Sequence, residues 1–136
     1  MASELRVNTL KDAAGNNSIA TSVVFNGTAK AWLNYNQSGD SVRDSYNISS
    51  TSDDGVGDKR YTLTSNMANA NYSVTALVQG DNGDSANRFI NLSNFSDADN
   101  PTTSKYGTQT YAISSFSSFV DTDDDYTCTS IFGDLA

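Results

Sequence analysis

The feature that most constrains this chain is a period-two alternation of apolar and polar side chains, in runs of about five to eight residues. The run over 29–36 places Ala31, Leu33 and Tyr35 on one face, and the run over 72–79 likewise places four apolar side chains together. Turns rich in Gly, Asn and Asp separate the runs. This spacing predicts about eight or nine antiparallel strands, as in a sandwich or barrel.

The composition agrees with an all-β chain. The 136 residues include 20 Ser, 14 Thr and 15 Asn but a single Glu, Glu4. Ser, Thr, Asn and Asp compete for backbone hydrogen bonds and so disfavour helices. We therefore expect an antiparallel, jelly-roll-like β-sandwich over 29–136, preceded over 1–28 by an extended N-terminal β arm with a strand over 18–25.

Several function classes are excluded by what the chain lacks. It has no His and one Cys, so His-based catalysis and zinc–thiolate sites are ruled out, and we expect no enzyme, cofactor or metal. The net charge of −8 opposes binding to nucleic acid. No apolar run is long enough to span a membrane, and no secretory signal is visible near Glu4, so we expect synthesis in a cytosol.

Three acidic or thiol features have ordinary structural explanations. Asp121, Asp123 and Asp125 have the one-three-five spacing of a calcium loop but lack its Gly and Glu, which favours a solvated turn. Asp44 interrupts an apolar face of Val42, Tyr46 and Ile48, so its carboxylate would need a partner. Cys128 is expected to be a small buried apolar residue.

Two blocks, KAWLNYN over 30–36 and VRDSYNISSTSDDGVGDKRYTLTSNMANANYSV over 42–74, resemble a domain of tail fibres and related appendage proteins of tailed bacteriophages, marine and cyanophage-like ones above all. In that domain the blocks read roughly K-A-W-V-N-F-N and I-R-D-S-F-N-V-S-S. The fitting positions are Lys30, Ala31, Trp32, Asn34, Asn36, Arg43, Asp44, Ser45, Asn47, Ser49 and Ser50. Tyr35 and Tyr46 stand where the family has Phe.

The resemblance implies a structural virion protein, a short tail fibre or spike-type appendage that forms a homotrimer and contacts other tail or capsid proteins. Partner copies would cover faces that a thin core leaves wet, because 37% of the residues are hydrophobic and many of these are Ala. The expected interface residues lie in the arm: Leu5, Val7, Ile19, Val23 and Val24.

Fibres of this kind contact host surface glycans or proteins at distal loops. We expect such contact at the acidic turns over 51–59, 80–86 and 95–104, where divalent cations could bridge carboxylates to sugars. The carboxylates concerned are Asp53, Asp54, Asp81, Asp84, Asp97 and Asp99. Two alternatives are a capsid decoration or fibre protein without receptor binding, and a spike that degrades polysaccharide with paired carboxylates.

Overall fold

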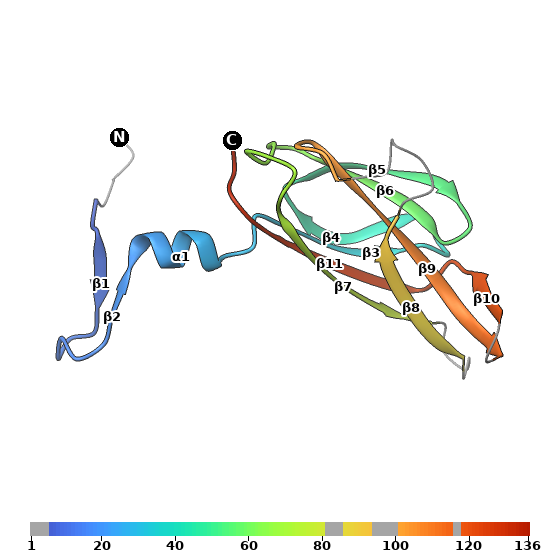
Figure 1. The fold of residues 1–136 in the computed structure, drawn as a ribbon, viewed down its shortest axis with the longest axis horizontal. Coiled ribbons are helices and arrows are strands. Elements are labelled where there is room, and N and C mark those ends of the chain that lie inside the picture. Colours follow the sequence, from blue (N-terminus) through green and yellow to red (C-terminus); the bar gives the residue numbers. More distant parts are fainter. Residues whose placement is uncertain (1–5, 81–85, 94–100, 116–117) are drawn as a thin grey trace.

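The computed structural model describes residues 6–80, 86–93, 101–115 and 118–136 (Figure 1). The elements in chain order are β1 (Thr9–Lys11), β2 (Ser18–Ala20), α1 (Thr21–Gly27), β3 (Ala31–Asn36), β4 (Ser41–Tyr46), β5 (Ile48–Gly55), β6 (Asp58–Leu63), β7 (Ser73–Gln79), β8 (Asn87–Leu92), β9 (Lys105–Ser115), β10 (Ser118–Asp121) and β11 (Tyr126–Phe132).

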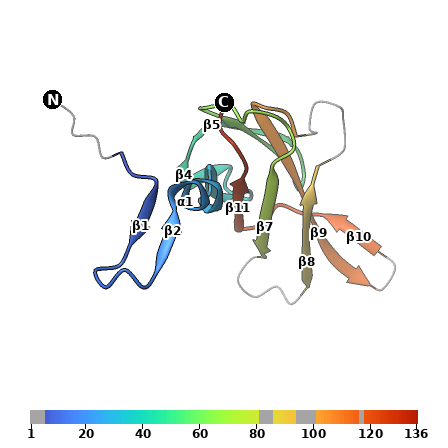
Figure 2. The same ribbon diagram turned by 60° about the vertical axis from the view of Figure 1, so that its left-hand side comes forward.

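Two antiparallel sheets form the body of the molecule, which confirms the predicted all-β sandwich. One sheet has four strands in the order β4-β3-β11-β7. In the other, one edge of the long strand β9 pairs with β8, and its opposite edge pairs first with β6 and then with β10. Strand β5 lies beyond β6. The two sheets meet at one side of the sandwich, where β7 of the four-stranded sheet and β8 of the other sheet lie side by side (Figure 2).

The core lies between the sheets, where the predicted alternation points its apolar side chains. Ala31, Leu33 and Tyr35 of β3 are buried as expected, while Trp32 between them is partly exposed on the outer face. The buried apolar residues are Ala31, Leu33, Tyr35, Tyr61, Leu63, Met67, Tyr106 and Ile131. In the described part of the chain the apolar core is therefore small and built largely from tyrosine.

Three tyrosines form the centre of this core. The rings of Tyr35 and Tyr61 meet edge to face with centroids 5.8 Å apart, and Tyr61 and Tyr106 are 5.1 Å apart. A buried phenol needs a hydrogen-bond partner. Tyr61 bonds with the Thr108 hydroxyl at 3.0 Å, Tyr106 bonds with the Thr129 hydroxyl at 2.6 Å, and Tyr35 donates to Asp40. The sandwich is therefore held by a hydrogen-bonded aromatic centre.

Strand β4 does not have the expected buried face. The expectation that Val42, Asp44, Tyr46 and Ile48 share one apolar face is wrong. Val42, Asp44 and Tyr46 are all exposed on this edge strand, and the Asp44 carboxylate accepts a hydrogen bond from the backbone N–H of Ser45. The reason is Asn47, whose φ of 59° turns the chain out of one sheet and into the other. Ile48 therefore belongs to a different sheet, and the alternation does not continue across the turn.

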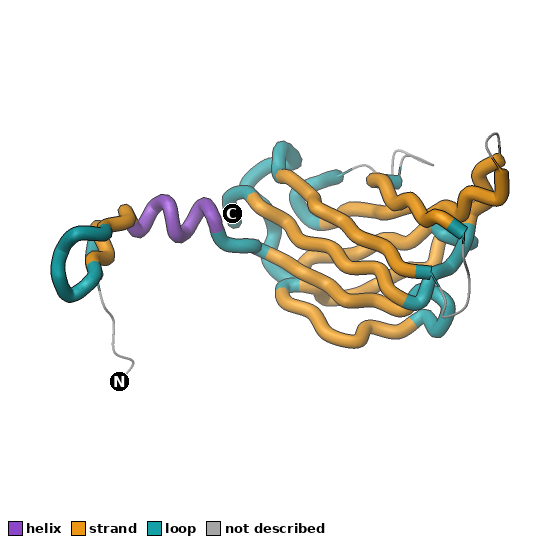
Figure 3. The backbone as a smooth tube through the Cα atoms, turned by 90° about the horizontal axis from the view of Figure 1, so that it is seen from below, coloured by secondary structure: helices purple, strands orange, loops and turns teal. Residues whose placement is uncertain are grey.

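The N-terminal region projects from one end of the sandwich (Figures 1 and 3). Its hairpin pairs three residues of β1 with three of β2, and α1 follows directly. The expected strand over 18–25 is thus wrong beyond Ala20. Among the described residues, no strand pairs with residues 21–27, and a helix satisfies their backbone hydrogen bonds locally.

Candidate functional site

The projecting segment over 6–28, called the arm from here on, exposes apolar side chains from every element it contains. No residue of α1 is buried, and Val23 and Phe25 are 56% and 51% exposed. The other exposed apolar side chains are Val7, Leu10, Ile19 and Val24. Of the residues predicted for an oligomer interface, four therefore lie accessible in the arm, and Leu5 lies outside the described residues.

A second exposed apolar surface lies at the opposite end of the sandwich. Phe89 of β8, Tyr111 of β9 and Phe119 of β10 come together there, and we call them the aromatic patch. The Phe119 ring meets the Phe89 ring at 6.2 Å and the Tyr111 ring at 6.4 Å, both edge to face. Phe89 is 50% and Phe119 63% exposed. Exposed aromatic clusters of this kind are typical of interaction surfaces.

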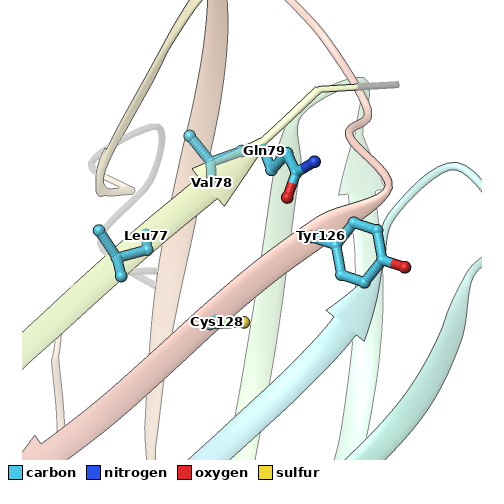
Figure 4. A pocket seen from close by; sticks show the side chains of 5 residues that line it. All are labelled: Leu77, Val78, Gln79, Tyr126 and Cys128. Carbon is cyan, nitrogen blue, oxygen red and sulfur yellow. The ribbon is translucent and has the colours of Figure 1, made fainter. Parts of the chain in front are cut away.

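A shallow groove lies between the ends of β7 and β11, as Figure 4 shows. Its lining residues are Leu77, Val78, Gln79, Tyr126 and Cys128. The expectation that Cys128 is a core residue is wrong: the buried residues of β11 are Thr127, Thr129 and Ile131, so Cys128 points to the outer face and is half-buried. The groove lining combines the apolar Leu77 and Val78 with the polar tips of Gln79, Tyr126 and Cys128, and it contains no carboxylate or amine.

Near this groove a cation packs on an aromatic ring. The Arg43 guanidinium lies 3.9 Å from the centroid of the Tyr126 ring and donates hydrogen bonds to the carbonyls of Tyr35 and Asp125. A guanidinium stacked in this way fixes both partners. Arg43 therefore fastens edge strand β4 to the start of β11, which is a structural role.

The acidic turns are held by buried cations. Lys59 is fully buried, and its Nζ lies 2.7 Å from Asp53 Oδ1 and 3.1 Å from Asp123 Oδ1. Burial acts to lower the pKa of Lys59, but the hydrogen bonds and charges of both carboxylates outweigh it and raise that pKa. The hydrogen bond from Lys59 in turn lowers the pKa of Asp53. This cluster joins the β5–β6 hairpin to the turn before β11.

A second buried ion pair, between Arg88 and Asp124, lies next to the Lys59 cluster. Arg88 Nε lies 2.5 Å from Asp124 Oδ1, and Asp124 is fully buried. The backbone N–H of Asp124 donates to Gln37 Oε1, which also accepts from the Thr110 hydroxyl at 2.9 Å. The run over 121–125 is therefore a packed turn, and the expectation that it is a solvated one is wrong for Asp124.

These contacts separate the carboxylates that the calcium spacing would bring together. Asp123 Oδ1 forms an ion pair with Lys59 and accepts a hydrogen bond from the Gly57 N–H, whereas Asp121 Oδ1 accepts one from the Gln109 amide. In the described part of the chain, no three carboxylate or thiol groups are arranged to hold a metal ion. A glycoside-cleaving acid needs a raised pKa, and the pKa of Asp53, the carboxyl that shares Lys59 with Asp123, is lowered.

Of the six carboxylates predicted for receptor contact, the structure describes two. Asp53 and Asp54 lie on β5 and pair with Lys59 and Arg60, the latter at 2.6 Å. Four others lie outside the described residues: Asp81, Asp84, Asp97 and Asp99. The role of all six in receptor contact stays a prediction.

The aromatic patch was not among the residues that sequence reasoning selected. A signal was present, because Phe89 shares a strand face with the polar residues Asn87 and Asn91. Alternation does not say which face is outside, however, and an aromatic residue is normally assigned to the core. Pairing of β8 with β9 and of β9 with β10 brings the three rings together.

Comparisons with family models, with curated proteins and with solved structures find no match for this chain. In the described residues, no helix combines the length and apolar character needed to cross a membrane.

Proposed function

We propose that this protein is a structural component of a tailed-phage virion, a short tail fibre or spike-type appendage that assembles through its arm. The observation that carries the proposal is an arm whose hairpin and helix expose apolar side chains while burying none of them. Assembly as a homotrimer, attachment to tail or capsid proteins and contact with the host surface all belong to the proposal.

The physical case rests on the size of the arm elements. Helix α1 has seven residues and no side-chain cap at Ala20, whereas isolated helices shorter than about 12 residues are marginal in water. A lone two-stranded hairpin is also marginal, and the one here pairs three residues per strand. Packing against another protein chain would supply the missing burial.

The residues that carry the phage resemblance have structural roles, which supports a shared fold. Asn47 takes a left-handed φ, donates to the carbonyls of Lys30 and Ser65, and accepts from the Ser65 N–H at 2.7 Å. Arg43 packs on Tyr126. The motif thus specifies the β4–β5 crossover and the edge of a sheet.

Light scattering with size-exclusion chromatography tests assembly through the arm. We expect the full chain to be oligomeric and the double variant Val23→Asp/Val24→Asp to be monomeric, because two charges would enter an apolar interface. The matched control, Ser22→Asp/Asn26→Asp, adds the same charge to exposed polar positions of α1 and should assemble normally. Deletion of 1–28 should likewise leave a folded but less associated sandwich. An unchanged mass for the double variant would refute the proposal.

Cryo-electron microscopy of the intact virion tests its place on the particle. Density for the sandwich on the tail would support the fibre or spike assignment, and density on the head would support capsid decoration. Absence from purified virions would contradict both. Shortening of host surface polysaccharide by the pure protein would favour the enzymatic spike.

A further inference from the structure

Two of the exposed apolar surfaces in the described part of the chain, the arm and the aromatic patch, lie at opposite ends of the molecule. In Figure 1 the arm extends from one end of the sandwich, while β10, β8 and the end of β9 that pairs with them, which carry the aromatic patch, lie toward the other end. The body of the sandwich separates them, so the arm of a chain does not cover the aromatic patch of that same chain.

The aromatic patch has the composition of an interface centre. Phe89 pairs across the ladder with Tyr111, and Phe119 contacts both rings. On β8 the polar Asn87 and Asn91 flank Phe89 on the same face. An apolar aromatic centre with a polar rim is the usual anatomy of a protein interface. The apolar character of the patch matches that of the Val, Leu, Ile and Phe side chains that the arm exposes.

Charge decides which part of another copy can approach this patch. Residues 29–136 hold six basic and fourteen acidic side chains, a net charge of −8, whereas residues 1–28 hold two of each and are neutral. Contact between two sandwich bodies is therefore opposed by repulsion. The arm itself, residues 6–28, holds Arg6, Lys11 and Asp12, a net charge of +1, so it is an apolar part of a second copy that the acidic sandwich does not repel.

We propose that the arm of one copy docks on the aromatic patch of the next, so that the chains associate head to tail. Such a contact is heterologous: two different surfaces meet, and repetition closes into a ring, such as a trimer, or continues as a fibre. The inference rests on the proposed function for self-association and adds the partner surface.

The outer face of the four-stranded sheet is a poorer match for the arm. This face exposes Trp32, Tyr46 and Leu77. Polar groups interrupt it, however, because Asn34 and Asp44 face each other across the ladder and Arg43 is stacked on Tyr126. These polar and charged groups would lose hydration beneath an apolar helix. Leu77 of that face, which is 71% exposed, therefore serves as a control position.

Complementation between two variants tests the contact. The arm variant, Val23→Asp/Val24→Asp, keeps an intact patch, and the patch variant, Phe119→Asp, keeps an intact arm. Each alone should be monomeric where the wild type is assembled, with association weakened by about 100-fold or more. Mixed in equal amounts, they should form a one-to-one dimer that grows no further, because one good arm meets one good patch.

Controls keep the two proposals distinguishable. Leu77→Asp places the same charge on the opposite sheet and should assemble like the wild type, and circular dichroism with thermal unfolding checks that each variant is folded. A patch variant that assembles normally, or a mixture that stays monomeric, would overturn head-to-tail docking while leaving assembly through the arm intact. An arm variant that still assembles would overturn the proposed function as well.

Discussion

At the scale of single residues, the informative position is Lys59. Its ammonium is fully buried between Asp53 and Asp123. Removing Lys59 leaves two carboxylates whose side chains are 47% and 29% exposed, so water can solvate them, and the loss is that of two charge-assisted contacts, about 2 kcal/mol. We expect Lys59→Met to lower the free energy of unfolding by roughly that amount, seen as a lower urea midpoint with an unchanged slope.

The neighbouring residue provides the control for this prediction. Arg60 pairs with Asp54 at 2.6 Å, but both side chains are partly exposed. Such pairs contribute at most about 1 kcal/mol, so Arg60→Met should have a small effect. Equal losses of unfolding free energy in Lys59→Met and Arg60→Met would show that burial of the Lys59 ion pairs adds nothing to stability.

The core tyrosines predict sensitivity to alkali. Burial, with the hydrogen bond to Asp40, raises the pKa of Tyr35 from 10.0 to about 12, and burial raises the pKa of Tyr72 to about 12. The pKa values of Tyr61 and Tyr106 are raised as well, chiefly by burial. Folded tyrosines therefore hold protons that unfolded ones release, and this contribution to stability is complete below pH 10 and is lost as the pH rises toward 12.

Urea midpoints measured at neutral pH and at successive values above pH 10.0 check this prediction. The midpoint should fall steadily while tyrosinate absorbance rises together with unfolding. The fall of the urea midpoint at alkaline pH should be smaller in Tyr35→Phe, because that variant has one fewer tyrosine with a raised pKa. A variant with the same alkaline loss as the wild type would argue against a role for Tyr35.

At the scale of elements, the turn between β5 and β6 depends on Gly57. Its φ is +72°, and a Cβ there would lie 2.5 Å from the Thr110 carbonyl and 3.0 Å from backbone atoms of Thr122. This is where the edge of β9 passes from pairing with β6 to pairing with β10. Backbone atoms cannot move aside as a flexible side chain can, so the turn packs directly against the sheet.

We expect Gly57→Ala to destabilise the fold by about 3 kcal/mol or more, from dihedral strain and the clash together. Gly55→Ala is the control, because its Cβ meets nothing within 4 Å. Gly55→Ala should destabilise the fold less than Gly57→Ala, because dihedral strain acts at Gly55 without a steric clash. Thermal unfolding of both variants gives the comparison, and similar losses would remove the clash from the explanation.

At the scale of the whole molecule, charge governs association. Every copy carries a net charge of −8, and the exposed apolar surfaces must bring such copies together. Raising the salt from about 0.01 M to about 0.1 M shortens the Debye length from about 30 Å to about 10 Å. We therefore expect association, followed by sedimentation velocity, to tighten over this range. Weaker association at the higher salt would instead point to ion pairs across the interface.

The sequence by itself determined the local structure of much of the sandwich. Alternation placed Ala31, Leu33 and Tyr35 inward on β3, and the Gly and Asp turns marked the ends of most strands. These signals are local, because successive side chains on a strand point to opposite faces whatever the strand pairs with. A polar, Asn-rich composition was likewise enough to exclude a helical bundle.

Tertiary structure alone decided which face is inside, which strands are neighbours and which charges are buried. Strand β4 turns outward because Asn47 moves the chain between sheets, and residues 21–27 form a helix because no strand in the described part of the chain pairs with them. Lys59 meets Asp53 and Asp123, and Phe89 meets Tyr111 and Phe119, across sequence separations that no local pattern encodes. The physical reason is that burial and pairing are properties of contacts between distant segments, and the same alternating strand can satisfy them in several arrangements.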